Sequence, residues 1–229
     1  MLKMFRVLGR VCVLVAMPLL PAVNSSAGSV LYQFEPISTG PFPGGQTPQV
    51  TAAFQDISPG KVLLTISTAN LINGEFLSDL YFNFDPADNV NQLHFTRCYG
   101  PAAPVLAKVS IGENSFKVGG YGNYDIHLAF SKASVGKFSG GDIVTYQITE
   151  PRLDALDFAF MASVGCGPGP YYALACVQQL CGNTQWLGSS TVQPQPVPEP
   201  ASTSFLALAA GAGCVCLRRR RTNRTHSVR

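Results

Sequence analysis

The sequence predicts an all-β protein, an antiparallel β-sandwich of jelly-roll-like topology over residues 28–192. Apolar and polar side chains alternate at a period of two through most of this stretch, for example at 80–84, 126–130 and 144–148. Turn-forming pairs such as Asn73-Gly74 and Gly140-Gly141 separate the alternating segments. No convincing helical period occurs before residue 201, so the pattern favours a sandwich of short strands.

Ten segments carry this strand pattern, and each is short and bounded by turn residues. The predicted strands cover residues 30–34, 50–57, 62–68, 80–84, 91–96, 107–111, 126–130, 144–148, 156–160 and 171–178. The composition agrees with this prediction, because 46% of the residues are hydrophobic, only 13% are charged, and the chain has 22 glycines and 17 prolines.

Charge is distributed unevenly along the chain. Nine of the sixteen basic residues lie in the two terminal segments, and residues 28–200 hold seven basic and thirteen acidic residues, a net charge of −6. Nucleic acid requires a basic face on its partner, so this acidic body predicts no nucleic-acid ligand.

Residues 1–27 have the pattern of a signal peptide. Lys3, Arg6 and Arg10 precede an apolar segment at 11–20, and small residues end the stretch at Ala27. We expect a signal helix and cleavage after Ala27. An uncleaved anchor helix is the alternative, but the apolar segment is short for one.

The C-terminal end predicts a linker followed by a membrane segment. Residues 193–200 are rich in proline, and residues 201–217 are apolar and uncharged. As a helix this segment would be about 25 Å long, close to a hydrocarbon core of about 30 Å. Four arginines, Arg218, Arg219, Arg220 and Arg221, follow it and act as a membrane stop. We therefore expect a single transmembrane helix over 201–221 and a basic cytoplasmic end at 222–229.

This end of the chain resembles a known sorting tail. Val197, Pro198, Glu199 and Pro200 are followed by the apolar segment and then by the arginine cluster. The order resembles the PEP-CTERM tail of bacterial exported proteins. The resemblance implies processing by an exosortase, a membrane cysteine protease-transpeptidase. It implies a route rather than an activity, because such tails occur on unrelated bodies. Residues 222–229 make this end longer than is usual there.

The body is also similar to one that often precedes such tails. The similarity covers residues 62–85 and the closing segment 171–187. No established activity belongs to that body, so this resemblance supports only one β domain that extends almost to the linker.

Four cysteines of the exported body are disulfide candidates. They are Cys98, Cys166, Cys176 and Cys181. An oxidising compartment predicts two disulfides among them, and three pairings remain open. Zinc is the alternative, although the spacing lacks a Cys-x-x-Cys pair and no histidine is near.

Asp85, Asp88 and Asn89 group oxygen ligands on one loop, which makes Ca²⁺ the one cofactor to consider. The same residues also favour a plain turn, because their side chains bond their own backbone. The spacing of an EF-hand loop is absent.

The sequence contains few residues that could form a catalytic site. Asp125 and His127 would project from one face of a strand and could pair, but such pairs are commonly solvated. His94 is the other histidine of the body, and no Gly-x-Ser-x-Gly elbow is present. We therefore expect no enzyme.

Several aromatic residues suit either sugar stacking or packing. They are Tyr121, Tyr124, Tyr171, Tyr172 and Trp186. The favoured hypothesis is a non-enzymatic exported protein of the cell envelope or extracellular matrix. A secreted glycan-binding module, assisted by calcium, is the second, and a secreted hydrolase is the third. The expected partners are the membrane, an exosortase-like enzyme and exopolysaccharide. We expect anchoring by the C-terminal helix, at least transiently, before the protein reaches the cell surface or the medium.

Overall fold

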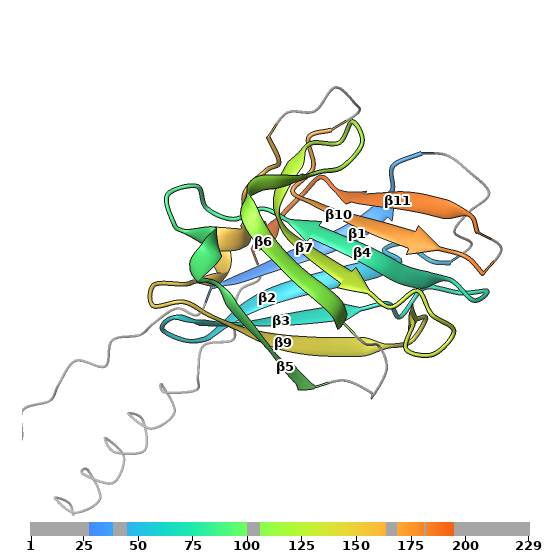
Figure 1. The fold of residues 1–229 in the computed structure, drawn as a ribbon, viewed down its shortest axis with the longest axis horizontal. Helices are drawn as coiled ribbons and strands as arrows, with labels where there is room; N and C mark the ends of the chain where they lie inside the picture. Colours follow the sequence, from blue (N-terminus) through green and yellow to red (C-terminus); the bar gives the residue numbers. More distant parts are fainter. Residues whose placement is uncertain (1–27, 39–44, 100–105, 164–168, 181, 195–229) are drawn as a thin grey trace, which may run out of the picture.

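The computed structural model describes residues 28–38, 45–99, 106–163, 169–180 and 182–194. Within these ranges the chain forms antiparallel strands in two facing sheets that share one strand (Figure 1). The predicted all-β antiparallel sandwich is therefore confirmed. The predicted signal helix and the segment 201–221 lie outside the described residues. Inside those residues, no helix has the length and apolarity that a membrane span requires.

The first sheet, sheet A, has the strand order β5-β9-β3-β2-β1. Its strands are β1 (Ser29–Pro36), β2 (Val50–Ser58), β3 (Lys61–Ser67), β5 (His94–Tyr99) and β9 (Ile143–Thr149). Strands β1, β2 and β3 pair in sequence order, and the Pro59-Gly60 turn joins β2 to β3. β5 forms the free edge of this sheet.

The second sheet, sheet B, has the strand order β11-β10-β4-β7-β6. Its strands are β4 (Phe76–Phe82), β6 (Leu106–Lys117), β7 (Asn123–Phe130), β10 (Ala173–Gln178) and β11 (Thr184–Ser189), with β8 (Phe138–Ser139) paired to β4. Hairpins join β6 to β7 and β10 to β11. Consecutive strands thus pair within one sheet more often than in a jelly roll, where they mostly alternate between sheets.

β1 connects the two sheets. Its first six residues pair with β2, and its last two, Glu35 and Pro36, pair with β11. The short strand β12 (Gln193–Pro194) pairs with β1 at Val30 and Leu31. The described chain therefore ends beside the strand with which it begins.

Two segments expected to be strand are 3₁₀ turns instead. The prediction of a strand at 156–160 was wrong, because Ala155–Phe158 forms the 3₁₀ helix η2. Asp154 caps η2, and Asp157 bonds back to the Asp154 backbone in a capping box, which outweighs the alternating pattern. The 3₁₀ helix η1 (Val90–Gln92), capped by Asn89, likewise delays the start of β5.

The core lies between the sheets and is rich in aromatic rings. Tyr32 on β1 is at its centre, fully buried, with ring centroids 5.7 Å from Phe82 on sheet B and 6.0 Å from Phe54 on sheet A. Phe54 stacks on Phe158 of η2 at 4.1 Å. The sheets and η2 are thus joined through one continuous set of rings, each pair of which adds to the stabilisation from burial.

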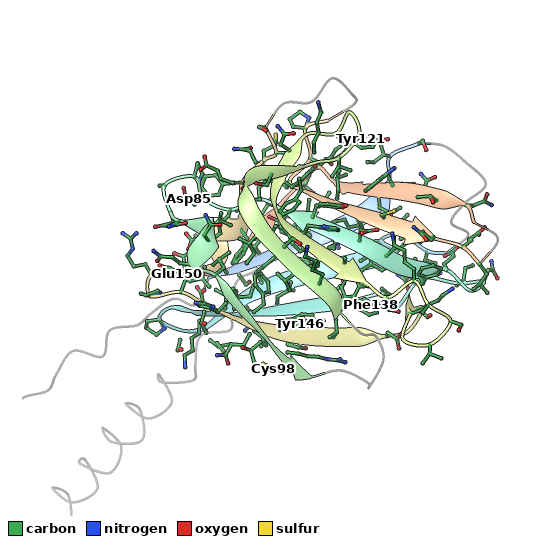
Figure 2. All side chains as sticks on the ribbon, in the orientation of Figure 1. Asp85, Cys98, Tyr121, Phe138, Tyr146 and Glu150 are labelled. Carbon is green, nitrogen blue, oxygen red and sulfur yellow. The ribbon has the colours of Figure 1, made fainter. Side chains whose placement is uncertain are left out.

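Two core tyrosines differ in how their hydroxyls are satisfied. The Tyr32 hydroxyl donates to the carbonyl oxygen of Phe158, which fixes η2 to β1. The Tyr146 side chain (Figure 2) is buried on β9, and its hydroxyl finds no hydrogen-bond partner among the described residues. An unpaired buried hydroxyl costs free energy, while a paired one contributes about 1 kcal/mol.

We therefore expect loss of the hydroxyl to change the free energy of unfolding in opposite directions at the two tyrosines. Tyr32→Phe is expected to lower the free energy of unfolding by about 1–2 kcal/mol, because a buried carbonyl loses its donor. Tyr146→Phe is expected to leave stability unchanged or raise it by about 1 kcal/mol. Urea unfolding of both variants measures the difference, and equal losses of stability would contradict the hydrogen-bond assignment.

Candidate functional site

The outer face of sheet B carries a second apolar cluster, separate from the core. Every residue of β10 from Ala173 to Val177 is buried, so this strand is covered on both faces. Leu174 points outward and is fully buried beneath a cover of larger side chains. The partly buried residues of this cover are Ile37, Tyr81, Phe116, Tyr121, Tyr171 and Trp186.

Strand register explains why these residues meet. Residues directly opposite one another on neighbouring strands project to the same face. One such row across sheet B contains Ser110, His127, Tyr81, Leu174 and Gly188. The adjacent row contains Lys108, Ala129, Asp79, Cys176 and Trp186. Strands distant in sequence thus bring Tyr81, His127 and Trp186 together.

Ring contacts connect the aromatic residues into a continuous layer. Phe116 lies 5.6 Å from His127, whose ring stacks on Tyr81 at 4.4 Å with an interplanar angle of 2°. The Tyr81 ring lies 6.1 Å from that of Trp186, which in turn lies 6.1 Å from Tyr121.

Tyr121 lies 6.2 Å from Tyr171 and completes the layer. We call the six residues Phe116, His127, Tyr81, Trp186, Tyr121 and Tyr171 the aromatic layer. Each of them is partly exposed, whereas Tyr124 and Leu174 beneath them are fully buried.

Gly188 makes room for one member of the layer. A side chain at this position would place its Cβ 2.5 Å from Cδ1 of Tyr171, which is closer than atoms can pack. The Tyr171 ring therefore lies over the backbone of β11 in space that only glycine leaves open. This contact holds the ring against the sheet rather than free in solvent.

Polar groups border the layer at Asp79. Its carboxylate lies 3.0 Å from Nε2 of His127 and 3.2 Å from Nζ of Lys132. Burial raises the pKa of Asp79, but hydrogen bonds from His127 and Ser78 and the charge of Lys132 outweigh it, so the pKa is below its usual value. Burial, with Asp79 and Cys176 nearby, raises the pKa of Tyr81. Asp79 thus stays ionised as an acceptor beside a neutral tyrosine.

The aromatic residues that the sequence analysis named lie in different environments in the structure. Tyr121, Tyr171 and Trp186 belong to the layer, Tyr124 is buried under it, and Tyr172 packs against the main core. Sequence reasoning missed Tyr81, Phe116 and His127 as members of the layer. The alternation on β4 and β7 did place Tyr81 and His127 on the outward face, but not beside Trp186.

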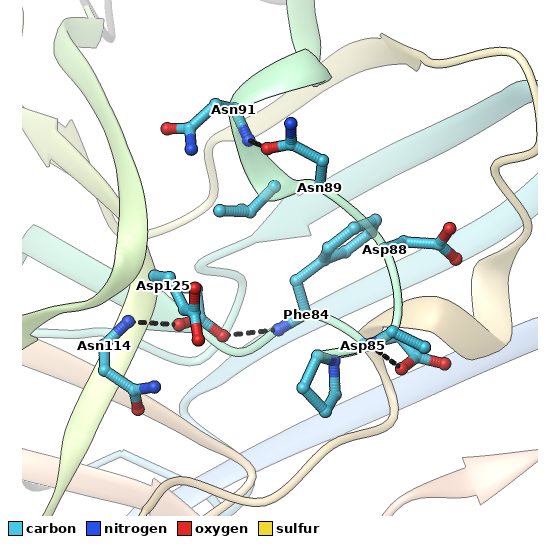
Figure 3. A pocket seen from close by; sticks show the side chains of 11 residues that line it. Phe84, Asp85, Asp88, Asn89, Asn91, Asn114 and Asp125 are labelled. Atoms are coloured by element: carbon cyan, nitrogen blue, oxygen red, sulfur yellow. Dashed lines mark hydrogen bonds between the residues drawn. The ribbon is translucent and has the colours of Figure 1, made fainter.

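The acidic loop after β4 borders a pocket of about 410 Å³ (Figure 3). Asp85 and Asp88 come together there with Asp157 of η2, with one carboxylate oxygen of each within 4.8 Å of the others. The side-chain oxygen of Asn89 is used elsewhere, because it caps η1 by accepting from the Asn91 backbone. Asp157 was missed because its segment was expected to be a strand, although the Asp154–Asp157 capping-box spacing could have indicated it.

Asp125 and His127, which the sequence suggested could pair, do not bond to each other. Asp125 accepts from the backbone amides of Phe84 and Asn114, at 3.0 and 2.6 Å, and holds the pocket loop in place (Figure 3). His127 bonds instead with Asp79 on β4. His94 is exposed on β5 of the other sheet. Asp125 therefore has a structural role.

The predicted disulfides are not confirmed. Cys98 is an exposed free thiol on edge strand β5 (Figure 2), and Cys176 is a buried free thiol on β10. Burial raises the pKa of the Cys176 thiol. Cys166 and Cys181 lie outside the described residues, and so do the sorting motif at 197–200 and the arginines at 218–221.

Asp157 predicts a pH dependence of stability. Burial raises its pKa to about 6, and Asp154, Asp88 and Asp85 add to the shift. Its protonation therefore stabilises the folded chain fully below the ordinary pKa, and this contribution is lost as pH rises through about 6. Because the carboxyl keeps partial contact with water, we expect about 1 kcal/mol.

Urea unfolding of Asp157→Asn is expected to show a flatter pH dependence between about pH 4 and pH 7 than the unsubstituted chain. Glu113→Gln removes an exposed acid from the pocket that Asp85 and Asp88 line, and serves as the control. Equal slopes for Asp157→Asn and the unsubstituted chain would contradict the assignment.

The acidic trio also makes the calcium prediction testable. Three carboxylates offer the oxygen ligands that Ca²⁺ prefers. Arg152 bonds Asp88 at 2.6 Å from the exposed side and would have to release it. Millimolar Ca²⁺ is expected to raise the melting temperature of the full chain, because a ligand of the folded state stabilises it. Asp157→Asn should lose the effect, and an unchanged melting temperature in the unsubstituted chain would refute the prediction.

Comparison with known proteins identifies the C-terminal end. The family model of the PEP-CTERM protein-sorting motif matches residues 196–221. A search of the curated proteins finds no match. One similar solved structure is the carbohydrate-binding module CBM3b from the cellulosomal cellobiohydrolase 9A from Clostridium thermocellum.

The similarity to this module has 15% identity and a TM-score of 0.32, and it covers 71% of this chain and 96% of that chain. So low a score supports no argument about this chain. The family match, by contrast, confirms the resemblance seen in the sequence, and the chain is one that carries a PEP-CTERM sorting motif, which implies an exported protein.

Proposed function

We propose that this chain is a non-enzymatic exported protein of the cell envelope or extracellular matrix, and that its sandwich binds polysaccharide through the aromatic layer. The observation that carries this proposal is the continuous, partly exposed set of six rings on the outer face of sheet B. Neither the tail nor the overall fold carries it, since both occur with many functions.

The geometry of the layer suits a sugar ligand as well as it suits packing. A pyranose ring has apolar C–H faces and a polar rim, so it can stack on an aromatic ring while its hydroxyls bond polar groups nearby. Tyr81 and Trp186 offer partly exposed rings, and Asp79 offers an ionised acceptor beside them. Exposed apolar patches with a polar border are characteristic of binding surfaces.

The support of the layer also favours binding. His127 stacks on Tyr81, and Tyr171 is confined over Gly188, so both rings are held before any ligand arrives. A surface that is already ordered loses less conformational entropy on binding. A set of free surface tyrosines would lack this advantage.

The arrangement of titratable groups supports a role without catalysis. Among the described residues, His94 and His127 are on different sheets, and His127 is already bonded to Asp79. Asp125 is held by two backbone amides. A hydrolase needs a nucleophile, a base and an orienting group within hydrogen-bond reach of one another. Within the described residues a histidine-based triad therefore has no observation in its favour, and the convergent carboxylates of Asp85, Asp88 and Asp157 are the one feature that favours a hydrolase.

For the tail, we propose that the segment 201–221 holds the protein in the membrane and that an exosortase-like enzyme then processes it near Val197–Pro200. The match to the sorting motif supports this route. The protein would then be displayed at the cell surface or released. β12 pairs with β1, so the last described residue, Pro194, lies beside Val30.

Substitutions in the aromatic layer test the binding proposal. Trp186→Ala and Tyr81→Ala are expected to reduce polysaccharide binding at least tenfold, because loss of one stacked ring costs about 1–3 kcal/mol by analogy with base stacking. Ile143→Ala, an exposed apolar residue on sheet A, is the control. A glycan array, read with and without a chelator, measures both the binding and any need for Ca²⁺. Equal signals from Trp186→Ala and the unsubstituted chain would contradict the proposal.

Intact mass of the protein from its native host tests the tail proposal. Fractions from membrane, surface and medium are measured separately. A mass that ends near 197–200 is expected in the surface or medium fraction. A mass that still includes Arg218–Arg229, found in the membrane fraction alone, would mean a stably anchored protein and would refute processing.

A further inference from the structure

Positive charge borders the aromatic layer on one side. Lys108 on β6 and Lys132, just after β7, are both exposed. Lys108 is opposite Ala129, in the same row as Asp79 and Trp186. Lys132 reaches Asp79, with its Nζ 3.2 Å from the carboxylate. We call Lys108 and Lys132 the basic margin, because they lie along the β6 and β7 side of the layer.

Acidic residues on this side of the sheet are few. Asp79 lies within ion-pair distance of His127 and Lys132. Glu35 is exposed at the far end of the row, opposite Gly188 on β11. The acidic trio Asp85, Asp88 and Asp157 belongs to the pocket loop and η2 instead. The body is acidic as a whole, so a basic margin beside the layer is a local exception to the overall charge.

We infer that the ligand of the aromatic layer is an anionic polysaccharide, whose sugar rings stack on Tyr81 and Trp186 while its carboxylates face the basic margin. This inference rests on the proposed function and adds the class of ligand. Each exposed ion pair contributes little affinity, so ring stacking provides most of the affinity. The lysines provide the specificity for an anionic over a neutral polysaccharide. Binding should also weaken as salt screens the charges.

Affinity electrophoresis through gels that contain polygalacturonate tests the inference on the full chain in mild detergent. The matched neutral probe is the same polymer after reduction of its carboxyl groups, which keeps the backbone and removes the charge. We expect polygalacturonate to retard the protein more strongly than the reduced polymer. We also expect added salt to weaken only the binding of the charged polymer.

Lysine substitutions show where the charge acts. Lys108→Gln and Lys132→Gln are each expected to weaken polygalacturonate binding about threefold, and to leave binding of the reduced polymer unchanged. Lys61→Gln on sheet A removes the same charge away from the layer and is the control. An equal loss in Lys61→Gln would mean general charge attraction and would overturn the inference.

The outcomes separate this inference from the function on which it rests. Equal retardation by both polymers, abolished by Trp186→Ala and unchanged by the lysine variants, would overturn the anionic ligand and leave polysaccharide binding intact. Retardation by neither polymer would overturn the inference. Retardation that does not depend on Trp186 would overturn the inference and the proposed binding face together.

Discussion

The structure depends on the need to cover sheet B on both of its faces. β10 is buried from Ala173 to Val177, and its outward residues Leu174 and Cys176 would face water if nothing lay over them. The aromatic layer supplies that cover, so it stabilises the sandwich by removing apolar surface from water. Nothing among the described residues covers the layer itself, and its rings stay partly exposed. The buried faces of these side chains therefore stabilise the sandwich, while their exposed faces are free to contact a ligand.

β1, the strand that both sheets share, lies between this face and the last described residues of the chain. β1 pairs with sheet A along its first part and with sheet B at its end, and β12 returns beside its start. Tyr32 holds this strand to η2 and to both sheets through its hydroxyl and its ring. The described chain thus ends beside β1 rather than beside the aromatic layer. The sorting motif and the proposed binding face therefore belong to different parts of the chain, which agrees with sorting tails occurring on unrelated bodies.

The sequence predicted the strands well where alternation was clear, as on β1, β3, β7 and β9, because one buried face imposes a period of two. It failed at η2, where capping by Asp154 outweighed the alternation of apolar residues. It did not assemble the aromatic layer, because that depends on long-range register: Tyr81 and Trp186 are on strands separated by β10. Asp85 and Asp88 could be predicted from the sequence because they share one loop. Asp157 could not, because it joins them only through the tertiary contact of that loop with η2.

The central claim is that the aromatic layer is the ligand-binding face, and the fluorescence of Trp186 tests it most directly. Trp186 is the single tryptophan of the chain, so its emission reports on this face alone. Titration with polygalacturonate is expected to change the emission saturably and to protect the indole from quenching by acrylamide. Binding of the polymer, shown by electrophoresis, with no change in emission or quenching would place the ligand elsewhere and contradict the account.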